Sequence, residues 1–301
     1  MIFNQLTMSQ HKPYTIINNN ESLWGSMYVP LYPKPKKNQG LRTVLFVSCE
    51  CGALMLRDLI AFETKYADLL NIVGVVTDDP LDPKARISLK KRIWSQFSVE
   101  KRAELFQNLI NTSINDDITC YSGAVKTDYF RKIFQEWNPE ALLMFCYGQK
   151  IDTPIYEFPV FGAYNFHPSD LPKKIGAGTQ PFQNAIQNGL KSSPMVIHKV
   201  TELIDVGPIV GVSPQINICL EDGSYPSSIL TLLDKITSVG GWMGVALVAE
   251  LIKIKESGSK NQVNNIDFEE LMPEDLKQKL NSPAVNDLNE KYEVPLHPMM
   301  H

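Results

Sequence analysis

The chain has 301 residues, 44% of them hydrophobic, which predicts one large folded domain or one domain with a smaller appendage. Its 29 basic and 33 acidic residues give a net charge of −4, which argues against a protein that holds nucleic acid by bulk positive charge. It shows neither the charge order of a signal peptide nor a run of about 18 apolar residues, so we expect a cytoplasmic protein with no membrane partner.

Residues 1–41 are polar and turn-rich, and they end in the Pro- and Lys-rich run YPKPKKNQG. Such a composition is typical of a solvent-exposed segment. We therefore predict an N-terminal arm at 1–41, a catalytic domain at 42–255 and a short appendage at 256–301. The segment Asp82–Asn115 is interpreted as an insertion into the domain.

The first apolar segments of the chain predict a strand–helix–strand unit. Thr43–Ser48 and Ile72–Thr77 are short, β-branched apolar runs typical of strands covered on both faces. Between them, Cys51–Leu70 has apolar residues at helical spacing. The order predicts a parallel pair with a right-handed crossover.

The alternation continues along the chain. Further helices are predicted at Val99–Ile114, Asp128–Trp137, Gln180–Gln187, Ser227–Ile254 (interrupted at Gly240–Gly241) and Pro273–Leu280. Further strands are predicted at Ala141–Cys146, Phe161–Phe166, Met195–Val200 and Ile209–Ile218, the last one antiparallel or at an edge. The pattern indicates an α/β fold: a Rossmann-like open, mostly parallel sheet with helices on both faces and a small C-terminal appendage.

The five cysteines are scattered along the chain, and only Cys49 and Cys51 are close in sequence. One intervening residue is not the spacing of a zinc finger. We therefore expect reduced thiols in a reducing compartment and no metal.

Two segments carry residues suited to chemistry. The first, YNFHPSDLP, begins at Tyr164 and places Asn165 and His167 two residues apart at the end of a strand, on the same side. The second, VTELIDVGP, places Asp205 on a loop after another strand. Ligands of open α/β sheets bind beyond the carboxyl ends of the strands. These three side chains are therefore candidates for one crevice.

An amide, an imidazole and a carboxylate together can catalyse acyl transfer without a covalent intermediate. The Asn165 amide can donate to a developing oxyanion, and His167 can exchange a proton near neutral pH. Asp205 can orient the imidazole and raise its pKa. Each residue taken alone is more often structural, so the hypothesis depends on the combination.

At these residues the sequence resembles the folate-dependent formyltransferases, whose signature is N-x-H-P-S-x-L-P followed by D-x-G-P. The matching residues are Asn165, His167, Pro168, Ser169, Leu171, Pro172, Asp205, Gly207 and Pro208. The resemblance runs from about Arg42 to Lys255. It implies transfer of a formyl group from the co-substrate 10-formyltetrahydrofolate, with Asn165, His167 and Asp205 as catalytic residues.

The resemblance also implies a folate site and a cis Leu171–Pro172 bond. The implied folate-binding residues are Phe145, Tyr147, Gly148, Ile151, Glu202, Leu203 and Ile204. They come from two segments, FCYGQKI and the loop before Asp205.

The acceptor is predicted from departures from the family pattern. Residues 256–301 contain four Lys, no Arg and nine acids, and Ile175 stands where tRNA-specific members have Arg, so we expect tRNA not to be the acceptor. The loop SCECGALML lacks the donors that cradle a phosphate, which argues against a ribonucleotide. We expect a small amine, such as an amino sugar nucleotide.

Several alternatives stay open. A hydrolase releasing formate would need the same three residues, and a methionyl-tRNA formyltransferase-like activity is a further alternative. A non-catalytic folate-binding protein has no chemical need of all three residues. A dinucleotide oxidoreductase lacks its glycine fingerprint after the first strand. A homodimer is also left open.

Overall fold

The structure, a computed structural model, describes residues 12–19, 25–34, 37, 39–81, 93–259 and 263–285. Its strands are β1 (Tyr14–Asn18), β2 (Gly25–Pro30), β3 (Leu41–Val47), β4 (Leu70–Thr77), β5 (Cys120–Gly123), β6 (Ala141–Phe145), β7 (Ala163–His167), β8 (Ser192–Ser193), β9 (Val196–Lys199), β10 (Ile209–Val212) and β11 (Ile216–Asn217). Its α-helices are α1 (Cys49–Lys65), α2 (Val99–Asn115), α3 (Asp128–Trp137), α4 (Thr153–Tyr156), α5 (Pro181–Gln187), α6 (Leu233–Glu256), α7 (Phe268–Leu271) and α8 (Glu274–Asn281). Short 3₁₀ turns are η2 (Ile93–Gln96), η3 (Leu171–Lys173) and η4 (Ile229–Leu232).

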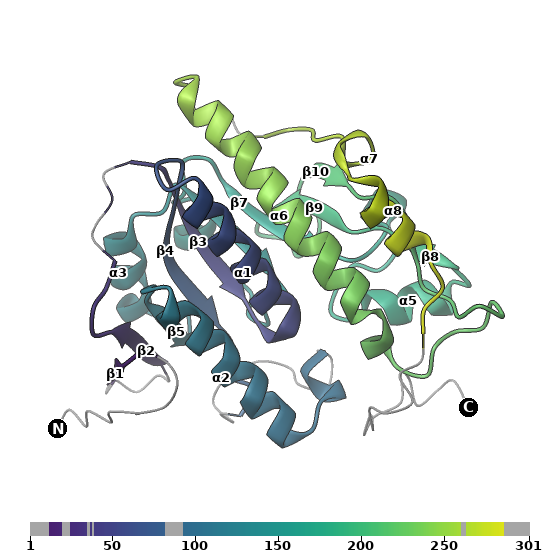
Figure 1. Cartoon of the computed structure of the whole chain (residues 1–301), viewed down its shortest axis with the longest axis horizontal. Coiled ribbons are helices and arrows are strands. Elements are labelled where there is room, and N and C mark those ends of the chain that lie inside the picture. Colours follow the sequence, from purple (N-terminus) through teal and green to yellow (C-terminus); the bar gives the residue numbers. More distant parts are fainter. Residues whose placement is uncertain are drawn as a thin grey trace.

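Nine of the strands form one mixed sheet in the order β1-β2-β5-β4-β3-β6-β7-β9-β10 (Figure 1). The strands β4, β3, β6 and β7 are parallel neighbours, as their apolar sequences predict. The strand β9 is antiparallel to β7, and β10 is the antiparallel edge expected for the segment after residue 209.

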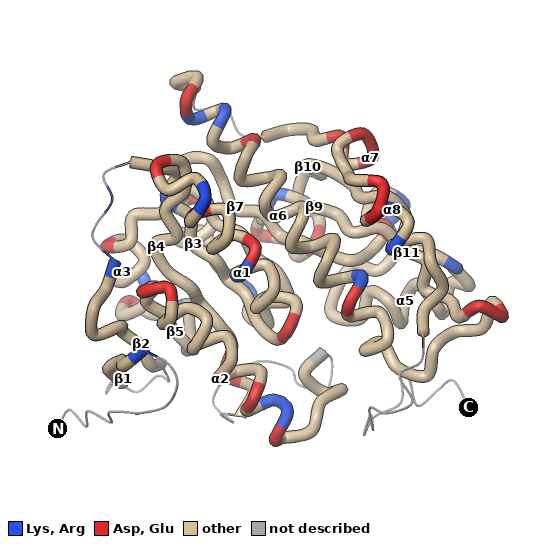
Figure 2. Tube along the Cα trace, in the orientation of Figure 1, with Lys and Arg blue, Asp and Glu red and all other residues tan. Residues whose placement is uncertain are grey.

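Both faces of the central strands are buried, which explains their continuous apolar runs. Leu45 and Val47 of β3 point into one core cluster together with residues of α1 and α6. Val44 and Phe46 point to the other face, where Phe46 packs against Phe130 of α3. Figure 2 shows the complementary pattern: basic and acidic residues are interspersed along helices and loops, and the central strands are largely uncharged.

Helix α6 is central to the core. Together with η4 it is long and apolar enough to cross a membrane by length and composition, contrary to our expectation, but 67% of its most apolar window is buried inside the protein. The predicted break at Gly240–Gly241 does not occur. Instead, a Cβ at Gly240 would lie 2.4 Å from the Phe145 ring, so glycine allows the helix to approach β6 closely.

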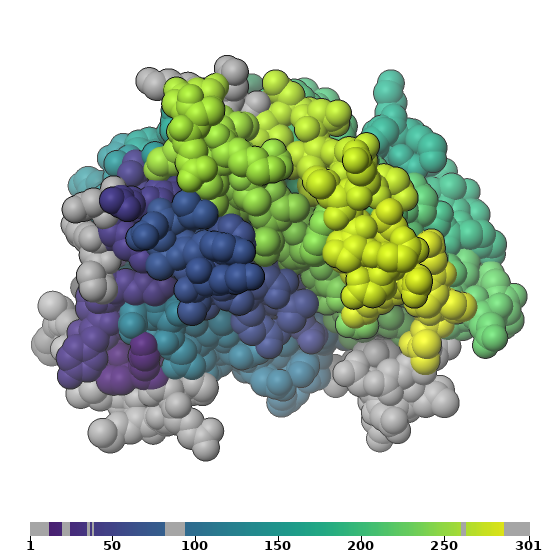
Figure 3. All heavy atoms as spheres, turned by 45° about the horizontal axis from the view of Figure 1, so that its top comes forward, coloured from purple at the N-terminus to yellow at the C-terminus, as the bar shows by residue number. Residues whose placement is uncertain are grey.

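The described part of the C-terminal appendage packs on α6. Figure 3 shows this last segment lying against the helix, and α8 contacts α6 and β11. The buried Lys235 of α6 donates to the carbonyls of Asn217, at 2.9 Å, and of Ser282. Because a buried ammonium group needs such acceptors, this lysine fixes the appendage to the domain.

The N-terminal segment is not the exposed arm that its polar composition predicts. The strands β1 and β2 are antiparallel neighbours, and β2 pairs with β5, so residues 14–18 and 25–30 extend the main sheet. Strands at an edge are partly solvated and their sequences are accordingly more polar. This is why composition alone indicated a solvated extension. The predicted insertion at 82–115 lies partly outside the described residues, and its remainder forms η2 and α2.

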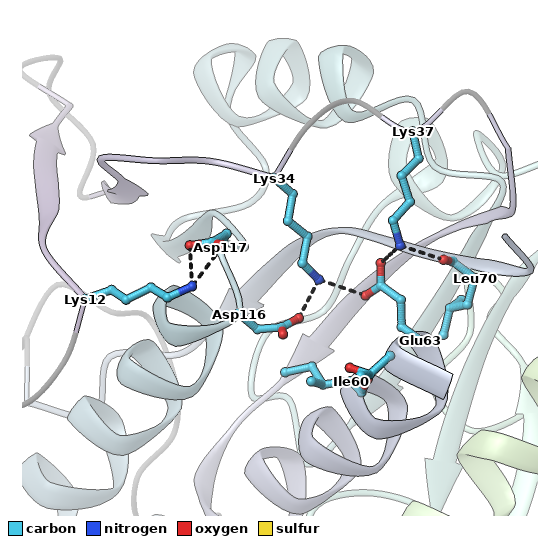
Figure 4. A network of polar contacts seen from close by, with 9 residues as sticks. Lys12, Lys34, Lys37, Ile60, Glu63, Leu70, Asp116 and Asp117 are labelled. Atoms are coloured by element: carbon cyan, nitrogen blue, oxygen red, sulfur yellow. Dashed lines mark hydrogen bonds and ion pairs between the residues drawn. The ribbon is translucent and has the colours of Figure 1, made fainter. Parts of the chain in front are cut away.

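Lysines from the Pro- and Lys-rich run pair with a buried acid (Figure 4). The carboxylate of Glu63, on α1, is 2% exposed and accepts from Lys34 at 3.0 Å and from Lys37 at 2.5 Å. Lys34 also pairs with Asp116, just after α2. These contacts fasten the segment between β2 and β3 to two helices, because a buried carboxylate is costly without cationic partners.

This network gives a prediction for stability. Replacing Glu63 by Gln removes the charge that both lysines contact, and we expect a loss of about 1–3 kcal/mol in the free energy of unfolding. The control is Glu104→Gln, which breaks the exposed Lys101–Glu104 pair on α2, with an expected change below about 0.5 kcal/mol. Urea denaturation measures both, and equal losses would contradict the role given to Glu63.

Candidate active site

The structure brings together the three residues predicted to be catalytic. Asn165 and His167 lie at the carboxyl end of β7, and Asp205 lies in the loop between β9 and β10. The Asn165 Nδ2 donates to Asp205 Oδ1 at 3.3 Å. His167 Nε2 lies 3.7 Å from the other oxygen of the same carboxylate. One carboxylate therefore contacts both side chains.

A second imidazole, which our sequence analysis missed, completes the cluster. His198 of β9 lies opposite Asn165 in the antiparallel register, and its Nε2 is 3.0 Å from Asn165 Nδ2 and 3.4 Å from Asp205 Oδ1. A lone histidine in an apolar strand carries no local signal. Only the pairing of β9 with β7 would have indicated its place.

Asp205 is a buried carboxylate held by several donors. Its Oδ2 accepts from the backbone N–H of Gly178 at 2.8 Å. Burial by itself raises the pKa of Asp205, but the hydrogen bond from His198, the charge of His167 and the Gly178 N–H outweigh it, and the pKa lies below its ordinary value. The carboxylate is therefore negatively charged at neutral pH.

His167 is oriented by a backbone carbonyl. Its Nε2 lies 2.8 Å from the oxygen of Gly176, and a carbonyl can only accept, so Nε2 carries a hydrogen in this arrangement. The imidazole is buried between β7 and the glycine-containing segment 176–178.

The backbone path of the loop explains why the D-x-G-P motif has these residues. Asp205 has a positive φ of 56°, which turns the loop sharply. Two residues later the chain passes so close to β9 that a Cβ at Gly207 would lie 1.8 Å from the Lys199 carbonyl oxygen. The Lys199 backbone N–H also donates to the Pro208 carbonyl at 2.9 Å. Only glycine at position 207 lets this loop close and aim the carboxylate at β7.

The residues implied to bind folate fall into two groups. Side chains of Phe145, Tyr147 and Ile151 are buried in the core, so this segment can offer a ligand mainly its backbone. Leu203 and Ile204 are instead 64% and 59% exposed beside Asp205, and Glu202 is also exposed. The backbone N–H of Gly148 donates to the Asp78 carboxylate.

The cis Leu171–Pro172 bond implied by the resemblance is wrong for this structure. Within the described residues no peptide bond is cis. Leu171–Lys173 forms the turn η3, in which the Lys173 N–H donates to the Asp170 carbonyl at 3.0 Å, and a trans bond suits this local hydrogen bonding.

The chain is similar to several known proteins. A family model described as "Formyl transferase" matches residues 45–225, more than half of the chain. The methionyl-tRNA formyltransferase of Thermotoga neapolitana is 37% identical over 149 residues, 50% of this chain and 42% of that protein. That of Dictyoglomus thermophilum is 30% identical over 175 residues, 57% of this chain and 48% of that protein.

The chain thus matches less than half the length of these two relatives. Among solved structures, glycinamide ribonucleotide transformylase 1 from Symbiobacterium toebii is alike in fold, with a TM-score of 0.50 and 14% identity over 71% of this chain and 90% of that chain. With more than half of its residues matched by the family model, the chain belongs to the formyl transferase family.

Proposed function

We propose that the protein transfers a formyl group from 10-formyltetrahydrofolate to the amine of a small acceptor, such as an amino sugar nucleotide. The observation that carries this proposal is the meeting of Asn165 and His167 on one buried, charged carboxylate, Asp205, in a chain of the formyl transferase family. No protein nucleophile is required, because the acceptor amine itself attacks the formyl carbon.

In this mechanism the amine nitrogen forms a bond to the formyl carbon, and the carbonyl oxygen becomes an oxyanion. The Asn165 amide nitrogen lies 3.0 Å from His198 Nε2, and it donates a hydrogen over the longer distance of 3.3 Å to Asp205 Oδ1. The longer contact is the weaker one, so we expect that hydrogen to turn to the oxyanion when substrate binds.

Proton movement completes the transfer. The attacking amine loses a proton, the bond from the formyl carbon to the folate nitrogen breaks, and that nitrogen gains a proton. His167 is suited to pass this proton, because the neighbouring negative charge of Asp205 stabilises the imidazolium. His198 is suited to hold Asn165 and Asp205 in place.

The matched relatives indicate a second candidate acceptor. The matched relatives include methionyl-tRNA formyltransferases, so the comparisons do not support our expectation that tRNA is not the acceptor. Methionyl-tRNA is therefore the second candidate acceptor. Hydrolysis of the co-substrate, in which water takes the place of the amine, remains the alternative reaction.

An acceptor screen separates these possibilities. Purified protein with 10-formyltetrahydrofolate is given amino sugar nucleotides, other small amines or methionyl-tRNA, while tetrahydrofolate and formate are measured. We expect tetrahydrofolate to form in step with a formylated small amine. Formylation of methionyl-tRNA alone would overturn the small-acceptor proposal, and release of formate without any acceptor would identify a hydrolase.

The catalytic assignments predict large losses of turnover. Asn165→Ala, His167→Ala and Asp205→Ala should each lower kcat at least about a hundredfold, because each removes an oxyanion donor or part of the acid–base pair. Asp205→Asn should also be severe, since it keeps the shape and removes the charge. The triple variant should lose far less than the product of the single losses.

The matched controls for this series are Asp222→Asn and Asn188→Ala, at exposed positions away from the cluster. Both should keep the wild-type rate, and circular dichroism should show that all variants are folded. A near-wild-type rate for His167→Ala would refute the mechanism. A fall in folate affinity with kcat unchanged would make these residues binding groups only.

The folate placement predicts where amide exchange slows. Saturating 5-formyltetrahydrofolate should protect the segments 145–151 and 202–205, because the ligand would cover the backbone of one and the exposed apolar side chains of the other. Helix α8, which packs on α6 and β11, should be unaffected. Unchanged exchange in both segments, with binding demonstrated independently, would show that the placement is wrong.

A further inference from the structure

Three cysteines converge at the carboxyl end of the sheet. Cys49 and Cys51 lie in the first turn of α1, directly after β3, and Cys146 is the first residue after β6. The two strands are parallel neighbours, with Val47 opposite Phe145. The three Sγ atoms all lie within 4.8 Å of one another, although Cys146 is remote in sequence.

The backbone is turned specifically to bring Cys146 into this group. Phe145 points into the core cluster shared with α1 and α6, so the next residue of a regular strand would point to the opposite face. Cys146 has a φ of +56° and packs against that same cluster instead. Cys49 also has a positive φ, of 50°. The Ser48 hydroxyl donates to the Cys146 carbonyl at 2.6 Å and joins the two strand ends.

The position of two of the cysteines favours negative charge on sulfur. Cys49 and Cys51 lie in the first turn of α1, a helix of 17 residues. The N-terminal end of a helix stabilises an anion, and the thiolate is the form of cysteine that binds metal ions.

We propose that Cys49, Cys51 and Cys146 bind a thiophilic d¹⁰ cation, Zn²⁺ or Cu⁺, through three thiolates. Metal–sulfur bonds of about 2.3 Å in a trigonal arrangement place the sulfurs about 4 Å apart, within the separations found here. Thiolates are the ligands that such ions prefer. Binding releases the remaining thiol protons to water as the metal–sulfur bonds form. A zinc ion would keep its fourth position for water.

The position relates this site to the candidate active site. Phe145, the residue before Cys146, lies opposite Phe166, the residue before His167, so the two sites lie at the ends of neighbouring strands. Cys49 and Cys51 are buried and Cys146 is partly exposed, which leaves Cys146 as the side from which an ion enters. The proposed metal site is inferred from the positions of the three thiols, and it does not depend on the proposed formyl transfer.

The test uses the full chain, reduced and freed of metal under anaerobic conditions. Co²⁺ serves as a coloured probe for a zinc site, and Cu⁺ is titrated separately as a complex with a competing chelator. We expect one equivalent of ion per chain, with a thiolate-to-cobalt charge-transfer band that Zn²⁺ removes if the site prefers zinc. Binding of Cu⁺ alone would assign the site to copper.

Cys49→Ser, Cys51→Ser and Cys146→Ser should each weaken binding at least about a hundredfold, because each removes a ligand from a three-coordinate site. The matched controls are Cys120→Ala and Cys219→Ala, two buried cysteines outside the group, which should bind as the wild type does. The wild type alone supplies a second measurement: bound ion should protect cysteines 49, 51 and 146 from alkylation, as mapped by peptide mass spectrometry. Absence of binding and of protection with both ions, or undiminished binding in the triple Ser variant, would overturn the proposal.

Discussion

The buried negative charge of Asp205 is the constraint on which the candidate site depends. A carboxylate in this position is stable only if donors reach it from every side, and they come from three parts of the chain. Asn165 reaches it from β7, His198 from β9 and the Gly178 N–H from the loop after η3. The charge thus connects the loop after η3 to β7 and β9, which are already paired in the sheet.

This constraint also determines backbone geometry. The left-handed turn at Asp205 and the close passage at Gly207 bring the carboxylate to the end of β7, and both are visible as a short motif because few residues tolerate them. The sheet limits where ligands can reach the side chains. With both faces covered by helices, reactive side chains have access to ligands only beyond the strand ends, where the triad and the three cysteines both lie.

Buried strands were predicted more accurately from the sequence than partly solvated ones. The strands β3, β4, β6 and β7 are mostly apolar because both faces are covered, and they were predicted with nearly correct bounds. The edge strand β1 and its neighbour β2 are partly solvated, so their composition resembled that of a loop. Short motifs located Asn165, His167 and Asp205, but His198 and the Cys49–Cys146 proximity depend on strand pairing and a positive φ, which no local pattern encodes.

The loop that carries Asp205 has an exposed apolar side as well as a buried charged one. Leu203, Ile204 and Val206 are all more than half exposed, and the carboxylate between them points inward. Contiguous exposed aliphatic side chains beside a polar cluster are typical of a surface that a ligand covers, since covering them removes apolar area from water. In the proposed function, the apolar part of the folate would cover these side chains while its formyl group faces Asn165. The same exposed loop therefore supports both the co-substrate placement and the direction from which we propose that it approaches.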